Sequence, residues 1–116
     1  MIAIKRVYEP PSLRDGYRVL VDGLWPRGLT RDAAAIDEWA KILAPSRDLR
    51  TWFAHLPERW PEFQLRYRSE LTRPEAVSEL ERLRKISLSR PLTLVYAARN
   101  EFENNARVIC EMLDRA

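Results

Sequence analysis

The sequence has few of the residues that build covalent or metal-centred sites. Its 116 residues include one cysteine, Cys110, and one histidine, His55. A single cysteine cannot close a disulfide within the chain, so the sequence predicts a reducing compartment, the cytoplasm. No group of His, Cys, Asp and Glu residues has the spacing of metal ligands, and we expect neither a metal nor a cofactor.

Glycine and long apolar runs are scarce as well. No run approaches the about 20 consecutive apolar residues that a membrane helix needs. The first residues enter a strand-like pattern at once, which leaves no room for a signal peptide. Gly23 and Gly28 are too isolated for a phosphate-binding loop or a dinucleotide fingerprint. The sequence therefore predicts no association with a membrane.

Arginine is the abundant charged residue. It accounts for 17 of the 20 Lys and Arg residues, and the net charge is only +3. The arginines are spread along the chain among acidic residues, whereas a nucleic-acid-binding protein gathers them on one face. A genome rich in G and C would produce the same bias, and we do not expect a nucleic-acid partner. Hydrophobic residues at 46% and charged residues at 32% are typical of one globular domain, here residues 1–116.

Three short segments rich in β-branched and apolar residues are predicted strands: 2–7, 18–24 and 92–97. The first two are separated by so few residues that the sequence leaves their relative direction open. Five helices are predicted from apolar residues spaced three and four apart. They begin at Thr30, Ser46, Glu58, Thr72 and about Glu101.

Three of these helices are predicted in more detail. The first is expected to continue to Pro45, with Trp39 on its buried face. The last is expected to begin directly after Arg99 and to bury Phe102. For the fourth helix, Thr72 and Glu75 are predicted to form a capping box.

Strand, helices, strand and helix in this order predict an α/β fold. We expect a small, mostly parallel sheet of three or four strands, flanked by about five helices in a single layered domain. Ligands of such sheets bind beyond the carboxyl ends of the strands. Those ends are residues 22–28 and 96–100, which the fold would bring to one edge.

An anion pocket is the leading prediction for this edge. Arg27 and Arg99 would lie at neighbouring strand ends, and the first backbone N–H groups of the last helix would lie beside them. Trp25, Asn100 and Asn104 are the other residues predicted to bind the ligand. The alternative is that Arg27 pairs with Asp22 or caps a helix, with no ligand involved.

Asp22 and His55 are the candidate catalytic residues. Asp22 could act as a general base or a metal ligand, or it could order the loop after its strand. His55 titrates near neutral pH and could transfer protons, or it could pack between the neighbouring tryptophans. Cys110 lies beside the apolar face of the last helix, where cysteine behaves as a small hydrophobic residue.

Several motifs are shared with a known family. They are Val7-Tyr8-Glu9-Pro10-Pro11, Asp22 to Gly28, Trp52-Phe53 with His55 and Pro57, Trp60 with Phe63, Arg66-Tyr67, Glu70-Leu71, and Tyr96-Ala97-Ala98-Arg99. On these motifs the chain resembles, along almost its whole length, the YeaO-like family of uncharacterised bacterial proteins (domain of unknown function 488). The resemblance implies a small α/β domain and carries no established activity.

The chain departs from the family pattern where a reaction would need side chains. The resemblance implies an arginine in place of Gly23, an aspartate in place of Asn100, and histidines in place of Glu103 and Asn105. The resemblance to longer, more distant relatives implies Cys-His-Arg at the positions where this chain has Asn104-Asn105-Ala106. Whatever those residues do in relatives, this chain cannot do in the same way.

Two hypotheses of different classes follow. The first is a small or degenerate enzyme that binds a phosphorylated or otherwise anionic small molecule, such as a nucleotide. The second is a non-catalytic binding or regulatory module that docks a protein or nucleic-acid partner at the same edge. The sequence leaves the oligomeric state open.

Overall fold

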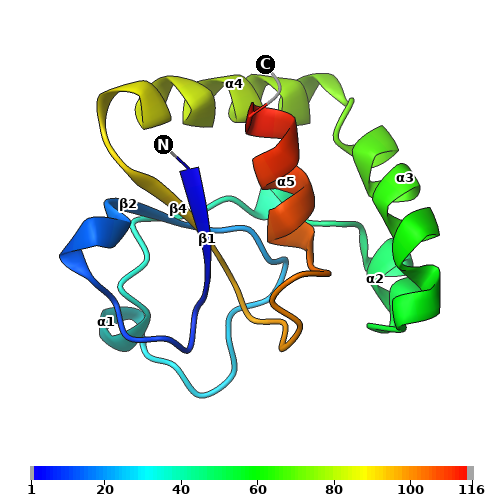
Figure 1. Cartoon of the computed structure of the whole chain (residues 1–116), viewed down its shortest axis with the longest axis horizontal. Coiled ribbons are helices and arrows are strands. Elements are labelled where there is room, and N and C mark those ends of the chain that lie inside the picture. Colours follow the sequence, from blue (N-terminus) through cyan, green and yellow to red (C-terminus); the bar gives the residue numbers. More distant parts are fainter. Residues whose placement is uncertain (1, 115–116) are drawn as a thin grey trace.

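Four parallel strands form one sheet in the order β1-β4-β2-β3 (Figure 1) in the computed structural model, which describes residues 2–114. The strands are β1 (Ile2–Arg6), β2 (Tyr17–Leu20), β3 (Glu38–Trp39) and β4 (Leu92–Tyr96). The α-helices of the described residues are α1 (Arg31–Ala34), α2 (Arg47–Phe53), α3 (Trp60–Glu70), α4 (Pro74–Ser89) and α5 (Asn105–Asp114). The predicted α/β class, with a small parallel sheet and about five helices, is confirmed.

The central strand β4 is buried along its whole length. Its alternate side chains point to opposite faces of the sheet, as the strand pleat requires. Leu92, Leu94 and Tyr96 join the main core, which also contains residues of α3, α4 and α5. Val95 joins a smaller cluster with Ala34 of α1. Cover on both faces explains why this strand is an almost continuous apolar run.

The connection from β1 to β2 settles the direction that the sequence left open. Both strands run parallel to β4, one on each side of it. Residues 7–16, which connect β1 to β2, therefore cross from one side of β4 to the other. It turns at Gly16, whose φ is +65°, and a Cβ there would lie 2.1 Å from the carbonyl oxygen of Pro91. Glycine is thus required at this turn.

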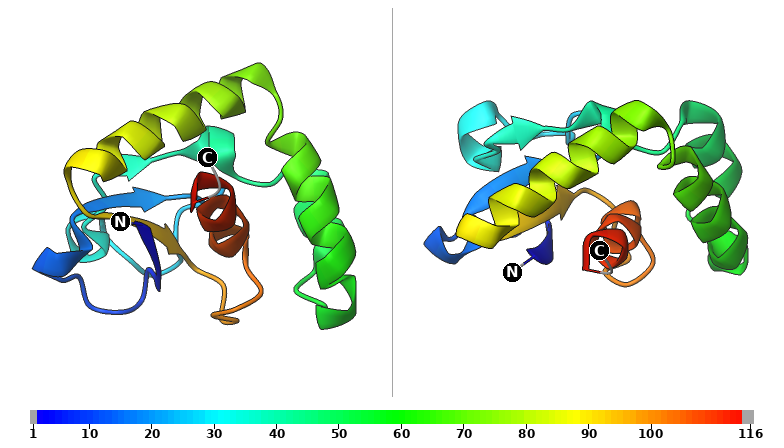
Figure 2. Two further views of the ribbon diagram at one scale, coloured as in Figure 1. Left: turned by 45° about the horizontal axis from the view of Figure 1, so that its top comes forward. Right: turned by 90° about the horizontal axis from the view of Figure 1, so that it is seen from above.

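Two of the helices, α2 and α3, lie at one end of the molecule. α5 packs against β1 and β4, and α3 packs against α2 and α5. Figures 1 and 2 show α2 and α3 standing at the end of the molecule farthest from α1, with the long α4 along one side. The loops that follow β2 and β4 face α2 across this end.

The predicted helix over residues 30–44 is wrong beyond Ala34. Thr30 does cap a helix, because its Oγ1 accepts a hydrogen bond from the Ala33 amide. At Ala35, however, φ is +50° and the helix ends after a single turn.

Hydrogen bonds to the open edge of β2 explain this early ending. The Asp37 amide donates to the carbonyl of Arg18, and the Ala40 amide donates to the carbonyl of Leu20, at 2.9 and 2.8 Å. These bonds place β3 beside β2 as the fourth strand. Trp39 is therefore half-buried in an edge strand rather than on the inner face of a helix.

The last helix also begins later than predicted. α5 starts at Asn105, not near Glu101, because the side chain of Asn104 accepts a hydrogen bond from the Arg107 amide and caps the helix. Phe102 therefore lies in the preceding loop, where its side chain is 73% exposed. The expected burial of Phe102 is wrong.

Two smaller expectations also differ. β2 ends at Leu20, because the chain turns away from the sheet well before residue 24. The predicted capping box of α4 is absent, since Arg73 is the N-cap and makes no side-chain cap bond. The hydroxyl of Thr72 donates instead to the carbonyl of Ser69.

Candidate functional site

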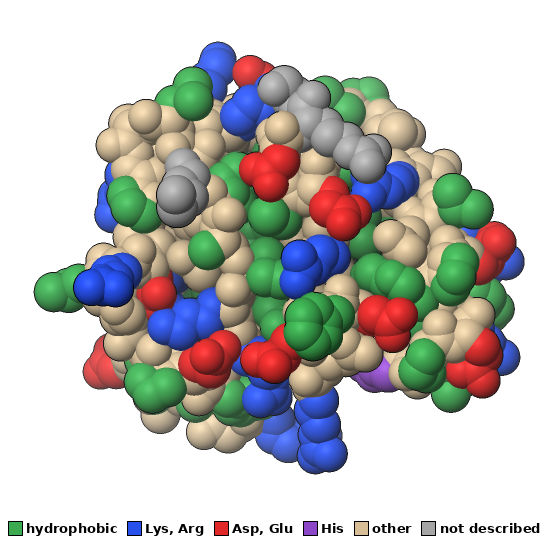
Figure 3. Space-filling model, in the orientation of Figure 1, with side chains coloured by type: hydrophobic (Ala, Val, Ile, Leu, Met, Phe, Trp, Pro, Cys, Tyr) green, Lys and Arg blue, Asp and Glu red, His purple; other side chains and the backbone are tan. Residues whose placement is uncertain are grey.

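A cavity of about 1160 Å³ opens beyond the carboxyl ends of β2 and β4. Figure 3 shows the hollow in the lower edge of the molecule, where Lys or Arg side chains (blue) project beside the histidine (purple). All seven residues predicted to form the site line this cavity: Asp22, Trp25, Arg27, His55, Arg99, Asn100 and Asn104.

Two walls enclose the cavity. The first, which we call the loop wall, consists of residues 22–27 after β2, residues 97–100 with Asn104 and Asn105 after β4, and Tyr8. The second, the helix wall, consists of Pro45, the cavity-facing residues of α2, His55 and Phe63 of α3. Within the helix wall, the rings of Phe53 and Phe63 stack with their centroids 4.3 Å apart and so hold α2 against α3.

Asp22 ties three elements together at the base of the loop wall. One carboxylate oxygen accepts from the Ala97 amide at 2.8 Å, and the other accepts from the Asn105 side chain at 3.0 Å. Its backbone carbonyl accepts from the Trp39 indole at 2.7 Å. Asp22 thus joins the end of β2 to β3, to the end of β4 and to the start of α5.

Burial raises the pKa of Asp22 above its ordinary value. The bonds from Asn105 and Ala97, and the nearby charges of Arg50 and His55, act in the opposite direction but do not offset the loss of solvation. Both carboxylate oxygens already accept N–H bonds, which is the arrangement of a structural carboxylate.

Arg27 and Arg99 are exposed and reach the cavity from the two loops of its loop wall. The Arg27 backbone is fixed, because its carbonyl accepts from the hydroxyl of Tyr8 at 2.9 Å. The guanidinium groups of Arg27 and Arg99 have no ion-pair or hydrogen-bond partner within residues 2–114. Arg27 therefore does not pair with Asp22.

Arg47 and Arg50 of α2 are cavity residues that sequence reasoning missed. With Thr51 they follow the i, i+3, i+4 spacing of one helix face, beside the buried face formed by Leu49 and Phe53. The sequence spacing could have identified this polar face of α2, but only the fold shows that the face lies opposite the loop wall. Their guanidinium groups, too, have no bonded partner among the described residues.

Asn100 and Asn104 line the cavity, but their side chains already serve the loop. Asn100 Oδ1 accepts from the amides of Phe102 and Glu103, both at 2.9 Å. Asn104 is buried, donates to the Asn100 carbonyl, and caps α5. These two residues fix the loop that presents Arg99.

His55 and Trp25 contribute rings to opposite walls. His55 is exposed, has a φ of +56°, and packs its ring 5.8 Å from that of Phe53. Trp25 is half-buried, donates from its indole to the Leu29 carbonyl, and meets Trp39 edge to face at 5.4 Å. Among the described residues, neither ring hydrogen-bonds Asp22.

Cys110 lies outside the cavity, on α5. Burial, together with the adjacent carboxylate of Asp114, raises the pKa of its thiol to about 11. A thiol with this pKa is a poor nucleophile at neutral pH.

Two further features, a metal site and a membrane-spanning helix, are not found among residues 2–114. No three His, Cys, Asp or Glu side chains there lie close enough together to hold a metal ion. No helix in that range has the length and apolar character needed to cross a membrane.

Comparison with known proteins gives close relatives of the whole chain. The Escherichia coli (strain K12) protein named "Uncharacterized protein YeaO" is 43% identical over 112 residues, which cover 97% of this chain and 96% of the relative. The proteins named "Uncharacterized protein Rv3073c" in Mycobacterium tuberculosis and "Uncharacterized protein Mb3100c" in Mycobacterium bovis are each 40% identical over 113 residues, which cover 97% of this chain and 93% of each relative.

No solved structure matches the chain. The family model described as "Inactive DUF488-N3 subclade" matches residues 1–116. Together with the YeaO match, this places the chain in the DUF488 family, within the subclade that this description names.

Proposed function

We propose that this protein is a degenerate enzyme that binds a small anionic molecule in the cavity without transforming it. The observation that carries the proposal is the charge of the cavity lining. Four arginines, Arg27, Arg47, Arg50 and Arg99, face a single carboxylate, that of Asp22. Guanidinium groups are the side chains best suited to bind phosphate or carboxylate, because they present several N–H donors in one plane.

The non-catalytic part of the proposal rests on the remaining polar groups. The Asp22 carboxylate is already bonded on both oxygens, and no carboxylate within residues 2–114 hydrogen-bonds His55. The description of the matching subclade as inactive agrees with this reading. A binding role needs only the arginines and the shape of the cavity.

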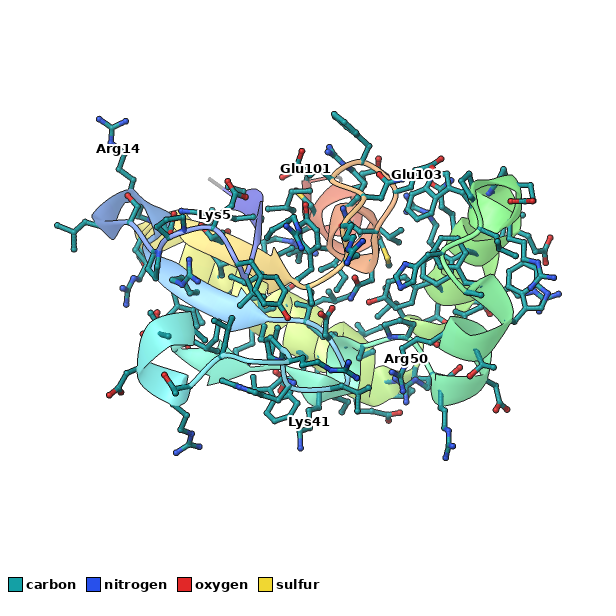
Figure 4. All side chains as sticks on the ribbon, turned by 90° about the horizontal axis from the view of Figure 1, so that it is seen from below. Lys5, Arg14, Lys41, Arg50, Glu101 and Glu103 are labelled. Atoms are coloured by element: carbon teal, nitrogen blue, oxygen red, sulfur yellow. The ribbon has the colours of Figure 1, made fainter. Side chains whose placement is uncertain are left out.

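Titration with inorganic phosphate, followed by ³¹P NMR, tests the proposal. We expect saturable binding to the wild-type protein, and weakening of about tenfold in Arg27→Ala and in Arg99→Ala, since one charge-assisted hydrogen bond contributes roughly 1.5 kcal/mol. Arg14→Ala is the matched control, because Arg14 is exposed and points away from the cavity (Figure 4).

Circular dichroism of the same variants separates loss of binding from loss of fold. Folded variants with unchanged phosphate affinity, or a wild-type protein that binds no phosphate, would contradict the proposal. The second outcome would favour the alternative function, in which this edge docks a macromolecular partner.

A further inference from the structure

Arg50 differs from the other arginines of the cavity in its burial. Its Nε atom is buried and has no hydrogen-bond partner within residues 2–114. The Nε of Arg84 is in the same situation, but the guanidinium of Arg84 is bonded to Glu81 through Nη1. No carboxylate in that range bonds to Arg50. A buried donor without an acceptor is unfavourable, so the described residues leave the guanidinium of Arg50 incompletely satisfied.

The position of Arg50 shows which part of its guanidinium faces the cavity. The guanidinium reaches from α2 towards the loop wall, and Figure 4 shows the side chain in the space between α2 and the rest of the chain. A Cβ on Gly23 would lie 3.8 Å from the Cζ of Arg50 and 3.9 Å from its Nη2. The absence of a side chain at Gly23 therefore leaves this part of the guanidinium open to the cavity.

Asp22 does not fulfil this need. The charge of Arg50 acts on Asp22 from a distance, but the carboxylate oxygens accept from Ala97 and Asn105 instead. Arg50 is thus a cation beside a carboxylate that is bonded elsewhere.

We propose that Arg50 is the anchor of the bound anion, and that this anion is a phosphate monoester of about the size of a nucleotide. The inference rests on the proposed function and assigns its ligand class. Arg27, Arg99 and the α2 arginines approach from three separate segments of the chain. A tetrahedral phosphate accepts hydrogen bonds from several directions, whereas a carboxylate accepts them mainly in one plane.

The size of the cavity adds the second half of the assignment. Pockets for small molecules measure roughly 300–1,000 Å³, and this cavity of about 1160 Å³ exceeds what a phosphate group alone would fill. The rings of Tyr8, Trp25 and His55 line the remaining space. Aromatic rings of this kind stack on planar groups such as nucleobases.

Calorimetric titration with adenosine 5′-monophosphate tests Arg50. We expect Arg50→Gln to weaken binding by about tenfold or more, because the amide keeps a donor but loses the charge. Arg50→Lys, which keeps the charge but not the fork of donors, should lie between Arg50→Gln and the wild type. Adenosine, which lacks the phosphate, should bind much more weakly than the monophosphate to the wild-type protein.

Gly23 supplies a test that leaves Arg50 in place. Gly23→Leu should cover the guanidinium and weaken binding of the monophosphate at least as strongly as Arg50→Gln. Gly23→Ala is the matched control, since its Cβ would meet Arg50 and Ala44 only at ordinary van der Waals distances, and binding should change by less than about twofold. If Arg50→Gln fails to fold, the Gly23 pair decides.

The outcomes separate this inference from the proposed function. If phosphate binding depends on Arg27 but neither Arg50→Gln nor Gly23→Leu weakens binding of the monophosphate, Arg50 is not the anchor, while the anion-binding function stands. Equal affinity for adenosine and its monophosphate would overturn the assigned ligand class. If neither phosphate nor the monophosphate binds the wild-type protein, both proposals fail.

Discussion

Two arginines of this protein, the buried Arg18 and the half-buried Arg50, show how much the partners of a residue decide its role. Arg18 is 3% exposed, and its guanidinium bonds to Asp15 at 2.6 Å and to the carbonyls of Ala34 and Ala35. All three of its nitrogens are therefore occupied. Within residues 2–114, Arg50 has no partner of this kind. The first arginine holds α1 and the β1–β2 connection to the sheet, and the second is the arginine that we propose as the anchor of a ligand.

Asp15→Asn tests the structural arginine. Asp15 also pairs with Lys5 at 3.1 Å, so the substitution leaves Arg18 buried without a counter-charge. Removing one partner of a buried ion pair typically costs about 3–5 kcal/mol. We expect a loss at the lower end of this range, because Arg18 keeps its bonds to two carbonyls. Urea unfolding at neutral pH measures it, with Asp32→Asn on the exposed face of α1 as the control.

The same residue predicts a pH dependence. Burial alone would raise the pKa of Asp15, but the bonds from the Ser12 amide, Lys5 and Arg18 hold it below its ordinary value of 3.8. The stabilisation is therefore present above that value and is lost as the pH falls through the lowered, folded-state pKa. The stability difference between wild type and Asp15→Asn should shrink as the pH falls below 3.8. A constant difference would contradict the ion pair.

Asp22→Asn separates a structural carboxylate from a catalytic one. Both oxygens of Asp22 face N–H donors, so an amide in this place must turn its own NH₂ towards one of them. We expect a loss of about 1–3 kcal/mol in unfolding free energy, the cost of one unsatisfied buried donor. Phosphate binding should be unchanged or tighter, since a negative charge leaves the cavity. Weakened binding in a folded variant would assign Asp22 a direct role in the site.

At the scale of elements, the sequence predicted what strong local patterns determine. The runs that became β2 and β4 were found because central parallel strands need continuous apolar residues. β1, at the edge of the sheet, was found from its apolar and β-branched residues. β3 was missed because two residues carry no pattern. Its position depends instead on the open edge of β2, so a tertiary interaction overrode the helical spacing of residues 30–44.

The candidate site was predictable to a similar extent. Arg27 and Arg99 could be found because each follows a predicted strand, and strand ends meet at one edge. Arg47 and Arg50 could not, because the sequence does not say which neighbour a helix face meets. Nor could the sequence show that the side chains of Asn100 and Asn104 form hydrogen bonds within the loop.

The end of α2 provides a prediction about an element. Ala54 and His55 both have positive φ, +48° and +56°, directly after the helix. A left-handed conformation costs a residue other than glycine roughly 1–2 kcal/mol. Ala54→Gly should therefore raise the unfolding free energy by up to about 1 kcal/mol, after the loss of backbone entropy is counted. Ala33→Gly, within the regular turn of α1, should lower it by about 1 kcal/mol. Equal effects would mean that Ala54 carries no strain.

At the scale of the whole molecule, the cavity lies between parts of the chain that are far apart in sequence. The loop wall belongs to the carboxyl ends of β2 and β4, and the helix wall belongs to α2 and α3. The helix wall is held by the hydroxyl of Tyr67, which donates to the Leu43 carbonyl, and by the bonds of Ser46 to Glu70. None of these bonds crosses the cavity. A ligand with a phosphate group would bridge the two walls.

Hydrogen exchange measures this bridging directly. If adenosine 5′-monophosphate contacts Arg27 and Arg99 on one wall and Arg50 on the other, it should slow amide exchange in residues 22–29, 97–105 and 47–56 together. The reason is that a ligand bound only to the closed arrangement lowers the population of open states of every segment that it contacts. Arg50→Gln should remove the protection of residues 47–56 first, while residues 22–29 keep part of theirs. Residues 74–89 of α4 serve as the internal reference because they line neither wall. Protection confined to one wall of the wild-type protein would mean that the ligand does not bridge the cavity.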